Sequence, residues 1–321
     1  MSSETGRSAR IAFVGVMSAV VVIAASVVFL RRRVDPHRRV VATPTSRSTS
    51  TTSTTTPPRV TSTTRPAPKV VRASPLGQAF ATYVGAREGR ITVAAYDTAS
   101  RQTWLYRPHD AQATASVVKV DIMAALLRQI SETSATRSQS QASELQRMIE
   151  LSDNDAATSL WNTVGGTEGL RAFNSHVGLV ETTPSTCVEC PDFPWPGWGL
   201  TTTTAGDQIQ LLKTIAFPNA ILTNASRLTA LDLMDNITPS ERWGVTGGVP
   251  ADVPVALKNG WLPLSNGDWQ INSVGWIRGQ GRNYLLAILT TGNPGENYGI
   301  ETTNEISSLV WQALAPDAAP S

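Results

Sequence analysis

The sequence predicts an α/β fold, an α+β sandwich in which one antiparallel sheet has flanking terminal helices and carries a separate all-helical lobe. Strand-like segments open the folded part of the chain, further strand-like segments close it, and the long stretch between them has helical periodicity. Strands from both ends of the chain would share one sheet, and the helices between them would form the lobe. We expect a binding site in the cleft between sheet and lobe.

The first two strands are predicted to form a hairpin. Segments 91–98 (ITVAAYDT) and 102–108 (QTWLYRP) are rich in β-branched and aromatic residues, and ASR turns between them. Three further strands are predicted near the end of the chain, at 254–262, 268–279 and 282–292.

Apolar residues at helical spacing fill the middle of the chain and recur at its end. The terminal segment, about 299–314, is expected to close the fold as a helix on the sheet. The helices of the lobe are expected at roughly 116–131, 141–150, 153–163, 167–176, 204–216 and 226–236.

The residues before 74 differ in composition from the rest. Residues 11–30 carry no charge, and a helix of this length spans the ~30 Å hydrocarbon core of a bilayer. They predict a transmembrane anchor after a cytoplasmic tail at 1–10, with a cleaved signal peptide as the alternative. Residues 31–73 are mostly Ser, Thr, Pro and Arg, which predicts a disordered linker. The folded domain is predicted at 74–315.

Charge is distributed unevenly along the chain. Residues 1–72 hold 12 of the 27 Lys and Arg but only 2 of the 25 Asp and Glu. From residue 73 onward the net charge is therefore 15 − 23 = −8. An acidic folded domain argues against nucleic acid as a partner, because nucleic-acid binding needs basic surfaces.

Three short motifs follow one another within the predicted domain. Each has an ordinary explanation alone, because a serine or aspartate before an apolar run is a helix cap and a lysine is common on an edge strand. Together they resemble the S-x-x-K, S-D-N and K-T-G set of serine penicillin-recognising enzymes, with K-N-G as the third member. The motifs are formed by Ser116 and Lys119, by Ser152, Asp153 and Asn154, and by Lys258, Asn259 and Gly260.

Over roughly 74–315 the chain resembles class A β-lactamases and the related D,D-peptidases, also in segments such as IELSDNDAATSLWNTVGG and LTTTTAGDQIQLLKTI. The resemblance implies a β-lactamase/transpeptidase-like fold and an active-site serine hydrolase that forms an acyl-enzyme. Its substrate would be a cell-wall peptide, a β-lactam or a related small-molecule amide or ester. We expect a monomer that needs no cofactor and no metal.

The resemblance also assigns the proton transfers. Ser116 would be the nucleophile at the positive end of a helix. Lys119, one turn further on, would accept its proton once burial and nearby cations have lowered the lysine pKa. Ser152 would pass a proton to the leaving nitrogen.

Substrate binding is assigned to the remaining motif residues. Asn154 would bind a substrate amide, and Lys258 a substrate carboxylate. Asn259 replaces a hydroxyl that helps to hold this carboxylate in the family, and Trp261, after Gly260, replaces a small residue. The oxyanion hole would be the backbone N–H groups of Ser116 and Trp261.

Hydrolysis of the acyl-enzyme in class A enzymes uses a glutamate on a loop. Glu189, eleven residues after Gly178, is the catalytic candidate here, with an exposed loop carboxylate as the alternative. Phe193 stands where the family has an asparagine, and Leu200 where it has an aspartate. We therefore expect slow β-lactam turnover. The alternative function is a catalytically weak or inactive cell-envelope binding protein on the same fold.

Cys187 and Cys190 are the only cysteines. A C-x-x-C pair also occurs in redox and zinc sites, but His37, His109 and His176 lack the spacing of zinc ligands. We expect a short disulfide that braces the loop and indicates an oxidising compartment. This favours a single-pass protein of the cell membrane with its catalytic domain outside the cytoplasm, although the arginines after residue 30 favour the opposite orientation.

Tryptophans are frequent near the predicted cleft, at 195, 198, 243 and 261. We expect most of them to pack in the fold. One or two could line a groove for a glycan or a peptide.

Overall fold

The computed structural model describes residues 71–133, 135–191, 193 and 195–316. The predicted tail (1–10), anchor (11–30) and nearly all of the predicted linker lie outside these residues. Within the described part of the chain, no helix combines the length and the apolar character needed to cross a membrane.

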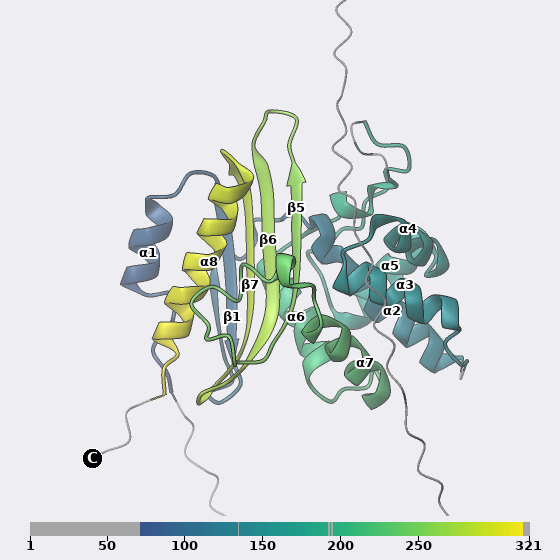
Figure 1. Cartoon of the computed structure of the whole chain (residues 1–321), viewed down its shortest axis with the longest axis horizontal. Coiled ribbons are helices and arrows are strands. Elements are labelled where there is room, and N and C mark those ends of the chain that lie inside the picture. The colour runs from purple at the N-terminus through teal and green to yellow at the C-terminus, as the bar shows by residue number, and fades with distance from the viewer. Residues whose placement is uncertain (1–70, 134, 192, 194, 317–321) are drawn as a thin grey trace, which may run out of the picture. The chain divides into compact units, whose positions relative to one another are not determined.

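Five strands form one antiparallel sheet in the order β2-β1-β7-β6-β5 (Figure 1). The predicted fold class is confirmed, since the opening strand β1 pairs with the closing strand β7. The bounds lie within two residues of the predicted ones: β1 is Arg90–Asp97, β2 Gln102–Tyr106, β5 Val255–Pro263, β6 Trp269–Gly279 and β7 Arg282–Asn293.

Helices cover both faces of the sheet (Figure 1). On one face lie α1 (Gln78–Gly85) and α8 (Glu296–Ala313), and on the other lie α6 (Ala205–Ala216) and the helical lobe. Because both faces are covered, the central strand β7 is buried without a break from Tyr284 to Thr290. A strand in this position has a continuous apolar run instead of alternation.

Helix α2 (Val118–Glu132) runs through the centre of the helical lobe. Every residue from Val118 to Leu127 is buried, because other helices of the lobe pack around it. A helix enclosed in this way is apolar nearly all round, and its two charged exceptions in this stretch are Lys119 and Asp121. The surrounding helices are α3 (Gln139–Glu150), α4 (Asn154–Thr163), α5 (Gly166–Val177) and α7 (Asn224–Asp235).

Short elements join the lobe to the sheet. The single turn η1 (Ala115–Val117) precedes α2, so the helix predicted from 116 begins two residues later. The small ladder of β3 (Gln112–Ala113) with β4 (Thr202–Thr203) places η1 beside the single turn η2 (Gly197–Leu200). The turn η3 (Pro239–Glu241) lies between α7 and β5.

Helix α1 was not predicted. Only Phe80 and Val84 are buried in it, which gives too little periodicity to mark a helix. Asp153 caps α4, as the ordinary explanation of its motif expects, since its carboxylate accepts a hydrogen bond from the Ala156 N–H at 2.7 Å.

Candidate active site

Ser116 lies partly exposed in η1, at the N-terminus of α2. The preceding residue, Ala115, has a φ of +46°, a left-handed conformation that costs a non-glycine residue on the order of 1–3 kcal/mol. Such a backbone persists only where its surroundings impose it. Here the Thr114 N–H donates to the Thr201 carbonyl at 2.8 Å, and the Asn272 side chain donates to the Thr114 carbonyl at 2.9 Å.

Gly260 brings strand β5 directly against this turn. A Cβ at Gly260 would lie 2.7 Å from the Ser116 nitrogen and 2.8 Å from both the Thr114 oxygen and the Val117 nitrogen. No side chain fits in this space. The glycine of the K-N-G motif is therefore required by the close approach of two backbones, and Trp261, which follows it, lies beside Ser116 in the same pocket.

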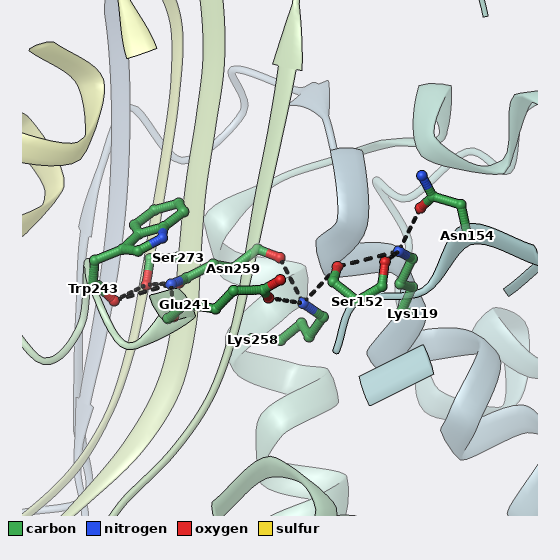
Figure 2. Close-up of polar contacts among 8 residues, drawn as sticks. All are labelled: Lys119, Ser152, Asn154, Glu241, Trp243, Lys258, Asn259 and Ser273. Carbon is green, nitrogen blue, oxygen red and sulfur yellow. Dashed lines mark hydrogen bonds and ion pairs between the residues drawn. The ribbon is translucent and has the colours of Figure 1, made fainter. Parts of the chain in front are cut away.

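Lys119 is completely buried one turn after Ser116. Its Nζ lies 2.5 Å from the Ser152 carbonyl, 3.2 Å from the Ser152 Oγ and 2.7 Å from the Asn154 Oδ1 (Figure 2). Burial, assisted by the charge of Lys258, lowers the pKa of Lys119 to about 6. Lys119 is therefore mostly neutral at pH 7, with a lone pair that can accept a proton.

The hydroxyl of Ser152 lies between two buried lysines (Figure 2). Its Oγ is 3.2 Å from the Nζ of Lys119 and 3.0 Å from the Nζ of Lys258. When Lys258 donates to this oxygen, the hydroxyl proton can point to the lone pair of neutral Lys119. Ser152 has a φ of +55°, a second strained position at this site.

Lys258 is fully buried on β5 and contacts a carboxylate that the motifs do not include. Its Nζ lies 3.3 Å from the Oε2 of Glu241, at the end of η3. Burial lowers the pKa of Lys258, and the charge of Glu241 opposes this shift.

The side chain of Asn259 is buried and braces the segment that carries Glu241 (Figure 2). Its Nδ2 donates to the carbonyls of Glu241 at 2.6 Å and Trp243 at 3.2 Å, and its Oδ1 accepts from the Ser273 hydroxyl at 2.6 Å. These contacts engage both ends of the amide. At the position where the K-T-G motif has a hydroxyl, the side chain of Asn259 therefore bonds to backbone carbonyls of the protein itself.

A cavity of about 250 Å³ opens beside Ser116. Asn154 from the S-D-N motif and Trp261 from β5 contribute to it, so residues from the lobe and the sheet meet here as expected. Five of the eleven lining residues are aromatic, and they come from the loop before η2, from η2 itself and from β5 and β6. These aromatic residues are Phe193, Trp195, Trp198, Trp261 and Trp269.

Glu189 does not lie with the other candidate residues. It is exposed on the loop, in a hollow lined by residues 188–191, 193, 195 and 196 that does not include Ser116. The predicted disulfide is confirmed, since Cys187 and Cys190 are bonded with Cα atoms 5.7 Å apart. The Cys187 carbonyl also accepts a hydrogen bond from the Gly197 N–H at 2.8 Å, so this loop is tied to η2.

Two residues at this site were not predicted from the sequence. Glu241 precedes Lys258 by 17 residues and belongs to no motif, so its contact with the lysine depends on the tertiary fold. Asn272 lies in β6 and looks like an ordinary strand residue. An asparagine inside a strand is unusual, and this was the available signal for its role in holding the Ser116 turn.

The family model described as "Beta-lactamase enzyme family" matches residues 138–314, more than half of the chain. Solved structures of the same fold include the TLA-1 extended spectrum beta-lactamase, with a TM-score of 0.65, 19% identity and coverage of 74% of this chain and 97% of that one. A beta-lactamase from Chitinophaga pinensis gives 0.65 at 20% identity, covering 74% and 98% of the two chains. An ancestral class A beta-lactamase gives 0.61 at 23% identity, covering 73% and 98%.

The curated relatives match a smaller part of this chain than the solved structures do. "Putative lipoprotein LppW" of Mycobacterium tuberculosis is 28% identical over 205 residues, which are 62% of this chain and 62% of the relative. The protein of the same name from Mycobacterium bovis has the same identity and coverage. The chain thus spans about 62% of the length of the curated relatives it matches.

Proposed function

The chain belongs to the beta-lactamase enzyme family, and from this premise we propose that it is an active-site serine hydrolase that works through an acyl-enzyme on Ser116. One observation carries the proposal. Lys119, Ser152 and Lys258 form a continuous chain of polar contacts one helical turn from that serine (Figure 2).

Acylation follows from the protonation states of these three side chains. Neutral Lys119 accepts the Ser116 proton while the serine Oγ bonds to the substrate carbonyl carbon. The bond to the leaving group then breaks, and the leaving group takes a proton from Ser152, which regains one from Lys119. The N–H groups of Ser116 and Trp261 stabilise the oxyanion, because Gly260 allows the two backbones to approach.

Deacylation has weaker support from the residues around Ser116. A water molecule needs a general base close to the ester, and misplacement by ~1 Å can cost ~100-fold in rate. None of the described residues that line the cavity is a carboxylate, and Glu189 is exposed elsewhere on the loop. We therefore propose slow hydrolysis of β-lactam acyl-enzymes.

The second candidate is a catalytically weak or inactive binding protein of the cell envelope. The absence of a carboxylate among the described cavity residues favours it, together with the aromatic walls. Against it stands the low pKa of Lys119, which a binding protein does not need.

We propose a location outside the cytoplasm, as a monomer held at the membrane by residues 11–30. The Cys187–Cys190 disulfide supports an oxidising compartment. The curated relatives, named as lipoproteins, support attachment to a membrane. A cell-wall peptide, a β-lactam or another amide or ester would then be within reach.

A fluorophosphonate probe distinguishes the two candidates. The enzyme proposal expects labelling of wild type and its loss in Ser116→Ala. The matched control is Ser131→Ala near the far end of α2, where the hydroxyl only bonds the Arg128 carbonyl, and it should label normally. A folded wild-type protein that resists labelling would support the binding protein.

A further inference from the structure

Glu241 is the only carboxylate among the described residues that pairs with the lysine of the K-N-G motif. Its Oε2 lies 3.3 Å from the Nζ of Lys258, and the two side chains are only 13% and 0% exposed. At such burial water screens an ion pair far less than at the surface. The place beside Lys258, where the resemblance puts a substrate carboxylate, already holds a carboxylate of the protein.

The segment that carries Glu241 is fixed on both sides. Asn259 donates to the Glu241 carbonyl at 2.6 Å and to the Trp243 carbonyl at 3.2 Å. The next residue, Gly244, donates its N–H to the Asn304 side chain at 2.6 Å. The backbone that carries Glu241 therefore cannot move away from Lys258 without breaking this bracing.

The lysines near Ser116 leave no surplus positive charge. Burial lowers the pKa of Lys119 to about 6, so Lys119 is mostly neutral at pH 7. If Lys258 holds its proton, its pair with Glu241 is neutral, and if burial removes that proton, the pair is negative. In neither state does the pair carry a net positive charge that would attract an incoming carboxylate.

No other cation among the described residues replaces this missing charge. The cavity beside Ser116 has no Lys, Arg or His in its described lining. Arg242 follows Glu241 but faces elsewhere, since it donates to the carbonyls of Asp235 at 3.1 Å and Val255 at 3.2 Å. What remains is an aromatic wall, in which Trp195 and Trp198 lie with ring centroids 6.4 Å apart.

We propose that Glu241 determines specificity by excluding substrates with a carboxylate near the scissile bond, so that the site takes uncharged esters or amides with a flat apolar group. This inference rests on the proposed function, because it concerns the substrate of the same serine. The Ser116 Oγ bonds to the carbonyl carbon and the alcohol or amine leaves with the serine proton. Water then regenerates the serine and releases the carboxylic acid.

The test uses two esters that differ by one carboxylate, phenyl phenylacetylglycinate and its 3-carboxyphenyl counterpart. The measured quantity is the ratio of their kcat/KM values. We expect wild type to favour the neutral ester by roughly 10-fold or more, because a carboxylate brought beside Lys258 meets the like charge of Glu241, which is only 13% exposed. Glu241→Gln should shift the ratio roughly 10- to 100-fold toward the anionic ester.

Two further variants separate charge from structure. Glu241→Asp keeps the negative charge and should keep the preference for the neutral ester. Glu301→Gln removes the same charge from an exposed position on α8 and should leave the ratio unchanged. A wild type that favours the anionic ester, or treats both equally, overturns the proposal whether or not any variant folds. An unchanged ratio in folded Glu241→Gln also overturns it.

Binding measurements keep this inference distinct from the proposed function. If wild type hydrolyses neither ester, the hydrolase proposal fails. Equilibrium binding of both esters to Ser116→Ala, followed by quenching of tryptophan fluorescence, then decides the question of charge. Tighter binding of the neutral ester supports the role of Glu241, and equal or weaker binding contradicts it.

Discussion

Gly260 lies so close to Ser116 that a Cβ at the glycine would be 2.7 Å from the serine nitrogen. The nearest atoms are backbone atoms, which cannot rotate away as a flexible side chain does. A substitution here must move either β5 or the turn that carries the nucleophile.

Gly260→Ala should therefore weaken both the fold and the reaction. We expect the free energy of unfolding in urea to fall by about 1–3 kcal/mol, as for an overpacked core. Labelling of Ser116 by a fluorophosphonate should slow by roughly 100-fold, because the turn is displaced. Gly85→Ala is the control, since a Cβ added at Gly85 would have no neighbouring atom within 4 Å. Normal labelling in Gly260→Ala would contradict the proposed contact.

Acylation should depend on pH through Lys119. Its neutral form accepts the proton, so the rate constant for labelling should rise with pH and level off above the pKa of about 6. The measurement is the second-order rate constant from pH 4.5 to 9. An ordinary lysine, with a pKa near 10.5, would instead give a rate that still rises tenfold per pH unit at pH 8.

Stability should depend on pH through Asp121. Burial raises its pKa from 3.8 to about 8, so the folded state holds a proton that the unfolded state has released above pH 4. The contribution of Asp121 to the unfolding free energy should therefore fall as pH rises from about 4 to 8, which is the reverse of the usual carboxylate behaviour, whereas the lowered pKa of Lys119 acts in the opposite direction above about pH 6.

Asp121→Asn should remove this loss of stability. At pH 8 we expect a gain on the order of a few kcal/mol relative to wild type, with a much smaller difference at pH 4. Urea unfolding at both pH values measures this difference in stability. Asp252→Asn, at an exposed position, is the control and should change neither curve. An equal effect of Asp121→Asn at pH 4 and pH 8 would show that the acid is not protonated in the fold.

Penicillin turnover should be slow if acylation occurs. A chromogenic β-lactam should give a burst no larger than the enzyme concentration and then a slow phase, because no carboxylate lies in the described cavity lining to activate water. Glu189→Gln should change the slow phase little. Fast turnover that this substitution removes would make Glu189 the general base.

Membrane topology can be tested on the full chain. A phosphatase reporter fused after residue 73 should be active if the domain lies outside the cytoplasm. The close cysteine pair motivates this expectation. Activity of a complementary cytoplasmic reporter at the same position would show that the arginines after residue 30 set the orientation.

The fold could be predicted because local patterns agree with it. Strand composition placed all five strands of the main sheet, and helical spacing placed the lobe. The S-x-x-K, S-D-N and K-N-G motifs indicated residues that the structure places around one cavity or one polar chain. Such motifs can be recognised in a sequence because a short spacing fixes which side chains share a helical turn or a strand.

The rest of the candidate site depends on contacts between segments that are distant in the sequence. Glu241 is an ordinary glutamate in sequence, and only packing of η3 beside β5 places it on Lys258. The aromatic wall was anticipated in part, at Trp195, Trp198 and Trp261. Phe193, on the loop before η2, and Trp269, the first residue of β6, also belong to it, and no periodicity shows that these two side chains meet at one cavity.

The pairing of β1 with β7 also constrains how the chain can be made. Arg90 pairs with Thr291, which is 291 − 90 = 201 residues further along the chain. Contacts of such separation form slowly, and β1 cannot pair with β7 until β7 has left the ribosome. A nascent chain that lacks its central strand has no finished sheet to resist unfolding, so it remains in a state that can be threaded through a narrow translocation pore.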